Sequence, residues 1–104
     1  MVAPVLSKHQ SAIAELCRRY HVKRLDVFGS VTREDFDPER SDIDFLVVDA
    51  DWAANESAWA FLEFRDELRR LLGKPVDLIA EGGIRNRYAR DEINASRERL
   101  VDQT

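Results

Sequence analysis

The segment of residues 42–48 constrains the fold more than any other part of the chain. Ile43, Phe45 and Val47 are apolar at alternate positions, and so are Leu46 and Val48 between them. Successive side chains of a strand point to opposite faces of a sheet. A strand that is apolar on both sides is therefore expected at a central position, covered on both faces. This predicts a layered fold in which helices pack on a sheet.

Other segments supply the remaining elements. Strand patterns occur at residues 22–28 and 76–80, and apolar side chains at helical spacing predict helices over residues 7–20, 52–72 and 84–101. Ser7 and Gln10 resemble a capping box at the first helix. The link from Phe28 to Asp42 is too short for a crossover helix, so those two strands are expected to pair antiparallel. We expect an α/β (α+β) fold: a small mixed β-sheet with helices packed on it.

Length and charge limit the function classes. The 104 residues and 44% hydrophobic content predict one domain over residues 1–104. The chain lacks an apolar run of the roughly 18–20 residues that span a membrane, and its single cysteine, Cys17, fits a reducing cytoplasm. The net charge of −4 argues against direct nucleic acid binding. We therefore expect a small acidic cytoplasmic protein that binds neither nucleic acid nor membrane.

A Gly-Ser pair follows the first strand. Gly29 would let the backbone approach a phosphate closely, and the Ser30 hydroxyl is a phosphate donor. A simple turn explains the same pair when it is taken alone.

Three aspartates form the second candidate feature. Asp42 and Asp44 lie two residues apart, which places both carboxylates on one face of a strand, roughly 7 Å apart. Asp77 interrupts the apolar strand at residues 76–80 and would face them from a neighbouring strand. Carboxylates suit Mg²⁺ or Mn²⁺. The alternatives are a solvated strand entry for the first two and an edge position paired with Lys74 for Asp77.

Taken together, the Gly29-Ser30 pair, the Asp42-Ile43-Asp44 run and the later strand residue Asp77 resemble the minimal nucleotidyltransferases (MNT) of the polymerase-beta nucleotidyltransferase superfamily. The resemblance covers roughly residues 22–100. It implies that Gly29 and Ser30 hold the nucleotide phosphates. It also implies that Asp42, Asp44 and Asp77 bind Mg²⁺ and are the catalytic residues, with ATP as the substrate.

Many stand-alone members resemble the antitoxin of HEPN–MNT toxin–antitoxin pairs, in which AMP is transferred to a tyrosine of an RNase toxin. The expected function is therefore AMPylation of a HEPN-type toxin. The toxin is the expected partner, and a hetero-oligomer of the two proteins is one possible assembly. The toxin would supply the acceptor residue, because larger superfamily members bind their acceptor with a second domain. Two alternatives are an antitoxin that acts by binding alone and a nucleotidyltransferase that modifies an antibiotic.

Several residues have more than one interpretation. Asp26 is either a solvated or salt-bridged residue or a neighbour of the site, and Arg33 either contacts phosphate or is solvated. Arg85, Arg87 and Arg90 form either a solvated helix face or a contact with the partner or the nucleotide. The aromatic side chains Trp52, Trp59 and Phe64 are expected in the core, unless one of them is an exposed partner anchor.

Overall fold

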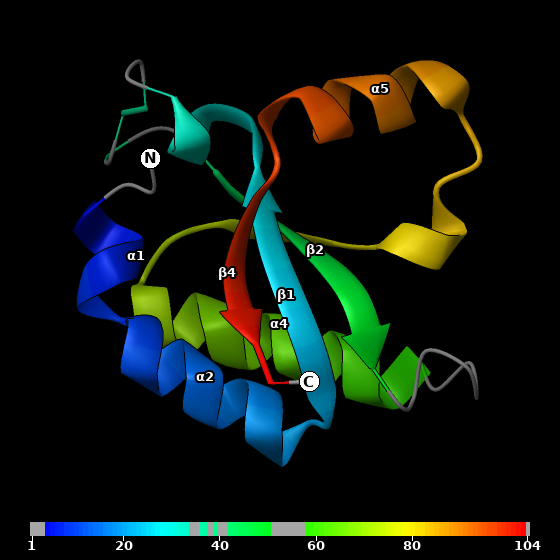
Figure 1. Cartoon of the computed structure of the whole chain (residues 1–104). Helices are drawn as coiled ribbons and strands as arrows, with labels where there is room; N and C mark the ends of the chain where they lie inside the picture. The colour runs from blue at the N-terminus through cyan, green and yellow to red at the C-terminus, as the bar shows by residue number, and fades with distance from the viewer. Residues whose placement is uncertain (1–3, 34–35, 38, 40–41, 51–57, 104) are drawn as a thin grey trace.

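A four-stranded sheet forms the centre of the molecule. The computed structural model describes residues 4–33, 36–37, 39, 42–50 and 58–103 (Figure 1). The strands are β1 (Val22–Phe28), β2 (Ile43–Ala50), β3 (Val76–Ala80) and β4 (Glu98–Asp102), in the order β3-β2-β1-β4. The helices are α1 (Pro4–Lys8), α2 (Gln10–Arg19), α4 (Ala58–Leu72) and α5 (Arg87–Ser96), and two short 3₁₀ turns are η1 (Gly29–Thr32) and η2 (Glu81–Gly83).

The sheet is mixed, as the short link between the first two strands predicts. Strand β1 pairs antiparallel with both β2 and β4, whereas β2 pairs in parallel with β3 through the crossover helix α4. The parallel register places Asp44 opposite Asp77. The central position of β2 is thereby confirmed, and two acidic residues from distant parts of the chain become neighbours.

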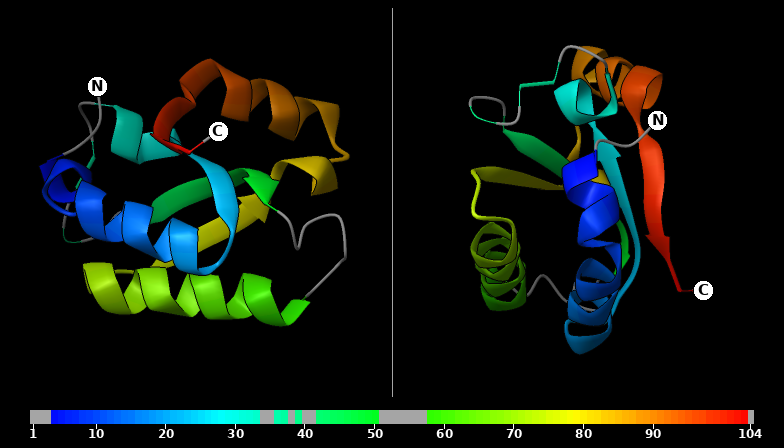
Figure 2. Two further views of the ribbon diagram at one scale, coloured as in Figure 1. Left: turned by 60° about the horizontal axis from the view of Figure 1, so that its bottom comes forward. Right: turned by 90° about the vertical axis from the view of Figure 1, so that its left-hand side faces the viewer.

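The two faces of the sheet are covered differently. Helices α2 and α4 lie on one face and α5 lies on the other, over one end of the strands (Figure 2). The larger core joins Ile13 of α2 and Phe64 of α4 to Leu25 and Val27 of β1. On the α5 face, Ile93 packs in a smaller cluster. None of the described helices is long and apolar enough to cross a membrane.

The prediction for the last helix is wrong in its second half. Helix α5 ends at Ser96, and residues 98–102 form β4 along β1. Leu100 fits a helical repeat with Ile93, but Leu100 and Val101 are both buried, as neighbouring strand residues are when both faces are covered. At the start of α5, the Asn86 side chain accepts a hydrogen bond from the Tyr88 backbone N–H and caps the helix.

The predicted first helix is also corrected. Two helices, α1 and α2, occupy this region, and His9 precedes α2 without a side-chain cap. The Gln10 side chain donates to the Leu100 carbonyl oxygen instead of closing a capping box (3.1 Å). Helix α4 is described from Ala58, so the start predicted at residue 52 and Trp52 lie outside the described residues. Trp59 is exposed, whereas Phe64 is in the core as expected.

One buried acid ties the α5 face together. Asp26 is fully buried in β1, and Arg24 donates to both of its carboxylate oxygens (3.1 Å each). Arg97, directly after α5, donates to Asp26 Oδ2 from Nε and Nη2 (3.0 and 2.8 Å). The same guanidinium also bonds Glu81 and Asn94 (2.9 and 3.0 Å). The end of α5 is thereby fixed to the strand that leads into η1.

Asp26→Ala should strongly destabilise the fold. Removing the carboxylate leaves the partly buried charge of Arg24 without this ion pair and reduces the partners of Arg97 to Glu81 and Asn94, which is expected to cost about 3 kcal/mol. Urea denaturation measures this loss. Asp66→Ala, which removes an exposed ion pair with Arg65, is the control and should cost less than about 1 kcal/mol. Similar losses in the two variants would contradict the assignment.

The thiol of Cys17 should be unreactive toward alkylating reagents in the folded protein. Its side chain is fully buried, and this burial raises the pKa of the thiol to about 12. The reactive thiolate is therefore nearly absent at pH 8. Iodoacetamide should label the chain rapidly only after denaturation, as mass spectrometry would detect. Rapid labelling of the native protein at pH 8 would show that Cys17 is accessible.

Candidate active site

A tight turn begins where β1 ends. Gly29 adopts φ +77°, in the left-handed region that favours glycine. A Cβ atom at this position would lie 2.5 Å from Oδ2 of Asp44, so any other residue would displace that carboxylate. The Thr32 hydroxyl donates to the Gly29 carbonyl oxygen (2.8 Å) and closes the turn. Glycine is thus required here both by its backbone angle and by the proximity of Asp44.

Two carboxylates meet beside this turn. Asp44 on β2 and Asp77 on β3 are in register on adjacent strands, with Asp44 partly buried and Asp77 exposed. Burial, the nearby charges of Asp77 and Asp42, and a hydrogen bond with Asp77 raise the pKa of Asp44 to about 6, while Arg33 opposes the shift. These carboxylates concentrate negative charge in a small space, which a bound cation would neutralise.

Asp42 lies outside the strand that was predicted to contain it. Strand β2 begins at Ile43, and Asp42 is exposed just before it, near enough for its charge to act on Asp44. Among the described residues, no three His, Cys, Asp or Glu side chains are gathered closely enough to form a metal-holding group. The Asp44–Asp77 pair has the hard oxygen donors that suit Mg²⁺, and the role of Asp42 as a metal ligand stays a prediction.

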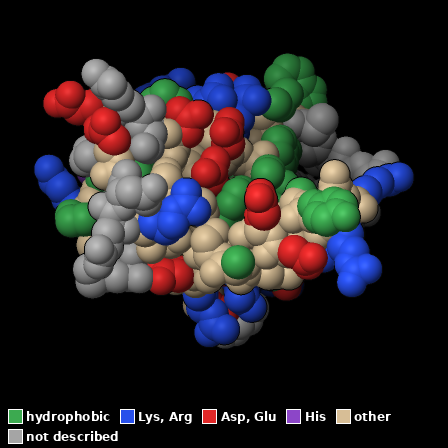
Figure 3. Space-filling view, turned by 90° about the horizontal axis from the view of Figure 1, so that it is seen from above, with side chains coloured by type: hydrophobic (Ala, Val, Ile, Leu, Met, Phe, Trp, Pro, Cys, Tyr) green, Lys and Arg blue, Asp and Glu red, His purple; other side chains and the backbone are tan. Residues whose placement is uncertain are grey.

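A pocket of about 740 Å³ opens next to the glycine turn. This volume lies within the range of small-molecule sites. Gly29 and Asp44 are among its lining residues, whereas Ser30, Asp42 and Asp77 are not. Seen from above, acidic side chains gather near the middle of this end of the molecule, and basic side chains lie beside them and around the edges (Figure 3).

The last turn of α5 supplies pocket residues that the sequence did not indicate. Ser96 and Arg97 line the pocket together with Thr32. Thr32 and Ser96 carry no distinctive pattern in the sequence. Asp26, which accepts hydrogen bonds from Arg97, does have a recognisable pattern, because it interrupts an apolar strand as Asp77 does. The interpretation of Asp26 as salt-bridged is confirmed, although it is fully buried.

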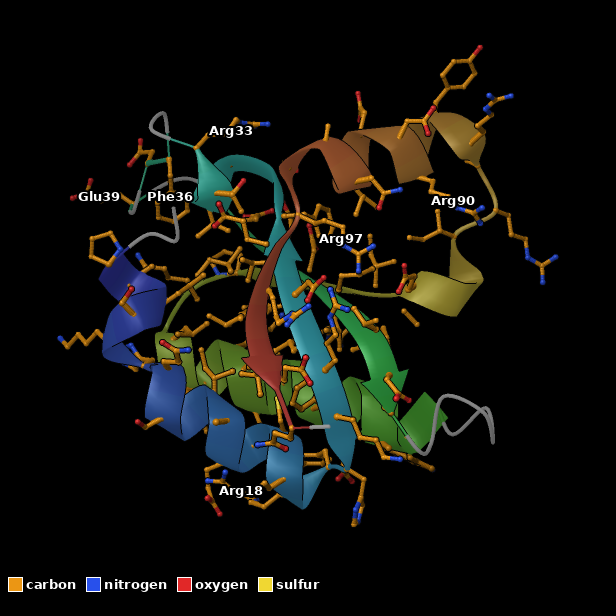
Figure 4. All side chains as sticks on the ribbon, in the orientation of Figure 1. Arg18, Arg33, Phe36, Glu39, Arg90 and Arg97 are labelled. Carbon is orange, nitrogen blue, oxygen red and sulfur yellow. The ribbon has the colours of Figure 1, made fainter. Side chains whose placement is uncertain are left out.

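The arginines near the start of α5 have different surroundings. Arg90 donates to the Ile84 carbonyl oxygen (2.7 Å) and helps to fix the segment before the helix. Arg85 and Arg87 are exposed, as is Tyr88, whose side chain is 83% accessible. Arg33 is exposed and lines the pocket (Figure 4). Arg90 therefore has a structural role, and a contact of Arg85 or Arg87 with a partner or the nucleotide stays a prediction.

Acids on adjacent strands of the mixed sheet thus lie next to a glycine turn and a pocket. The pattern of the nucleotidyltransferase domain family matches residues 10–100. The chain therefore belongs to the nucleotidyltransferase domain family. This match confirms the expected nucleotidyltransferase fold and the prediction of an enzyme of this class.

Two relatives and one solved structure illustrate the similarity. A protein from Methanocaldococcus jannaschii, provisionally named a protein adenylyltransferase, is 36% identical over 88% of this chain and 87% of its own. The protein adenylyltransferase MntA of Thermococcus cleftensis is 33% identical over 86% of this chain and 83% of its own. The fold also matches a structure of a tri-AMPylated Shewanella oneidensis HEPN toxin in complex with MNT antitoxin. That match has a TM-score of 0.67 and 20% identity, and it covers 93% of this chain and 72% of that one.

Asp44→Asn should stabilise the metal-free protein in a pH-dependent way. Because the pKa of Asp44 is raised in the folded state, ionising it costs stability as the pH rises from about 4 to about 6. The asparagine variant avoids this loss. In EDTA, its melting midpoint should exceed that of the wild type by more at pH 8 than at pH 4.

The exposed residue Asp49 lies on the same strand and supplies the control. Any midpoint difference in Asp49→Asn measures the general effect of replacing an aspartate on this strand and is subtracted from that of Asp44→Asn. A midpoint difference for Asp44→Asn that does not grow with pH would show that the carboxylate is not destabilised by its neighbours.

Proposed function

We propose that the protein is a Mg²⁺-dependent antitoxin that transfers AMP from ATP to a tyrosine of a HEPN-type RNase toxin. The observation that carries the proposal is the in-register Asp44–Asp77 pair beside the Gly29 turn. The pair joins a carboxylate at the pocket wall to an exposed one that an incoming protein can approach. The matches to protein adenylyltransferases support the same reaction.

In this proposal, different residues contact different parts of the nucleotide. Gly29 and Ser30 would position the β- and γ-phosphates, which leaves the α-phosphorus toward Asp44. Asp42, Asp44 and Asp77 would hold Mg²⁺, which supplies neutralisation of the triphosphate charge when it is bound. Catalysis in such a site rests on positioning and electrostatics, because the reacting groups belong to the nucleotide and the acceptor.

The transfer is an in-line displacement at the α-phosphorus. The tyrosine oxygen forms a bond to that phosphorus, and the bond from the phosphorus to the bridging oxygen of the β-phosphate breaks. Pyrophosphate leaves with the electron pair of the broken bond. Asp77 is the exposed member of the acid pair, and in this proposal it accepts the tyrosine proton. The products are an AMP–tyrosine ester on the partner and free pyrophosphate.

The relatives support a protein as the acceptor. The Methanocaldococcus relative is matched over 87% of its length, so the described similarity is not confined to a small part of it. The structural neighbour consists of an antitoxin of this fold with a toxin that carries three AMP groups. We therefore infer a HEPN-type toxin as the partner, in a hetero-oligomer with this chain.

A transfer assay tests the proposal. The purified protein is incubated with Mg²⁺, ATP labelled at the α-phosphate, and the product of the neighbouring reading frame as the candidate partner. Label should appear on a tyrosine of that partner, located by mass spectrometry, and EDTA should abolish it. Asp44→Asn should lower the initial rate by about 100-fold or more, because it removes charge from the metal-binding pair. Asp49→Asn should transfer at the wild-type rate.

The same mixture distinguishes the alternatives. Size-exclusion chromatography measures complex formation, and an RNase assay measures the toxin. If the wild type binds and silences the toxin without any transfer of label, the protein acts by binding alone and the enzymatic proposal is wrong. If label instead accumulates only on an added aminoglycoside, the acceptor is a small molecule.

A further inference from the structure

The amide of Gly29 has its partner inside the protein. Its N–H donates to Oγ of Ser96 (2.9 Å), which joins η1 to the last residue of α5 across 67 positions of the chain. The carbonyl oxygen of Gly29 is bonded by Thr32. Both backbone polar groups of the glycine are therefore fixed by hydroxyl side chains, and Ser96 supplies the contact from outside the turn.

Gly29 is held between Ser96 and Asp44. A Cβ atom on the glycine would lie 2.5 Å from Asp44 Oδ2, while its amide faces Ser96. All three residues line the same pocket. The pairing of Phe28 with Asp44 places the end of β1 beside this carboxylate, and the contact with Ser96 fixes the next residue, Gly29, from the side of α5.

Ser96 itself stands on a rigid support. The next residue, Arg97, lies beneath the end of α5 at its junction with β4 (Figure 4). Its guanidinium is held by the fully buried Asp26, two positions before Phe28 at the end of β1. The serine and the glycine turn therefore share one frame, because Asp26 is on the strand that leads directly into the turn.

We propose that Ser96 is a positioning residue for the nucleotide. By accepting the Gly29 amide, its hydroxyl sets the turn at the distance from Asp44 at which the triphosphate contacts both the turn and the metal-binding acids. Loss of the hydroxyl frees the turn and weakens nucleotide binding. This inference rests on the proposed function, since it assumes that ATP occupies the pocket.

Calorimetric titration with Mg²⁺ and the non-hydrolysable ATP analogue AMP-PNP tests the role. Ser96→Ala should raise the dissociation constant roughly five- to tenfold, the change expected for one lost hydrogen bond. Ser96→Thr retains the hydroxyl and should bind within about twofold of the wild type. Ser11→Ala removes an exposed serine from α2 and is the matched control, with unchanged affinity.

Hydrogen exchange of the Gly29 amide, followed by NMR, reports the contact without nucleotide. Exchange should be faster in Ser96→Ala than in the wild type and in Ser11→Ala. In the transfer assay, KM for ATP should rise in Ser96→Ala while KM for the toxin stays unchanged, a split that general destabilisation does not produce.

The outcomes separate the two proposals. If Ser96→Ala binds AMP-PNP as well as or better than the wild type, the positioning role is wrong whether or not AMP is transferred. If the wild type binds AMP-PNP with the expected Ser96 dependence but labels no protein, the proposed function is wrong and the role of Ser96 stands. If the wild type does not bind AMP-PNP, both proposals are overturned.

Discussion

The ion pair between Asp26 and Arg97 fixes the part of the fold on which the candidate site depends. A charged side chain is costly inside a sheet unless its charge is matched and its oxygens accept hydrogen bonds. Here both conditions are met by two arginines, one on the same strand and one just after α5. The interaction therefore ties the residue after α5 to β1, and the end of α5 forms one wall of the pocket.

The other wall depends on strand register. Asp44 and Asp77 become neighbours only because β2 and β3 pair in parallel with one particular alignment. A shift of one residue would turn one of the two acids to the opposite face of the sheet. The buried apolar residues of both strands prevent that shift, since it would also expose Phe45 or Leu78. Core packing on one face of the sheet thus keeps Asp44 and Asp77 together on the opposite face.

The sequence was informative where local pattern decides structure. Alternating apolar residues located β1 and β3 with the bounds that the structure shows, and the sequence singled out both Gly29 and Asp44, which the structure brings together. The helix expected after residue 84 was wrong beyond Ser96, because residues 98–102 pair with β1, a segment that is distant in sequence. Ser96 was missed for the same reason. A single serine acquires its role only through a contact that the tertiary fold creates.

The parallel pairing of β2 and β3 also affects the order in which the site can form. An antiparallel pair such as β1 and β2 closes through a local connection, whereas a parallel pair requires the chain to cross the sheet and return. Closing the longer connection costs more chain entropy before any contact compensates for it. The connection through α4 must close to bring Asp77 beside Asp44. A partly folded chain can contain the glycine turn and the first acids without Asp77 beside them, so the Asp44–Asp77 pair is a property of the finished fold alone.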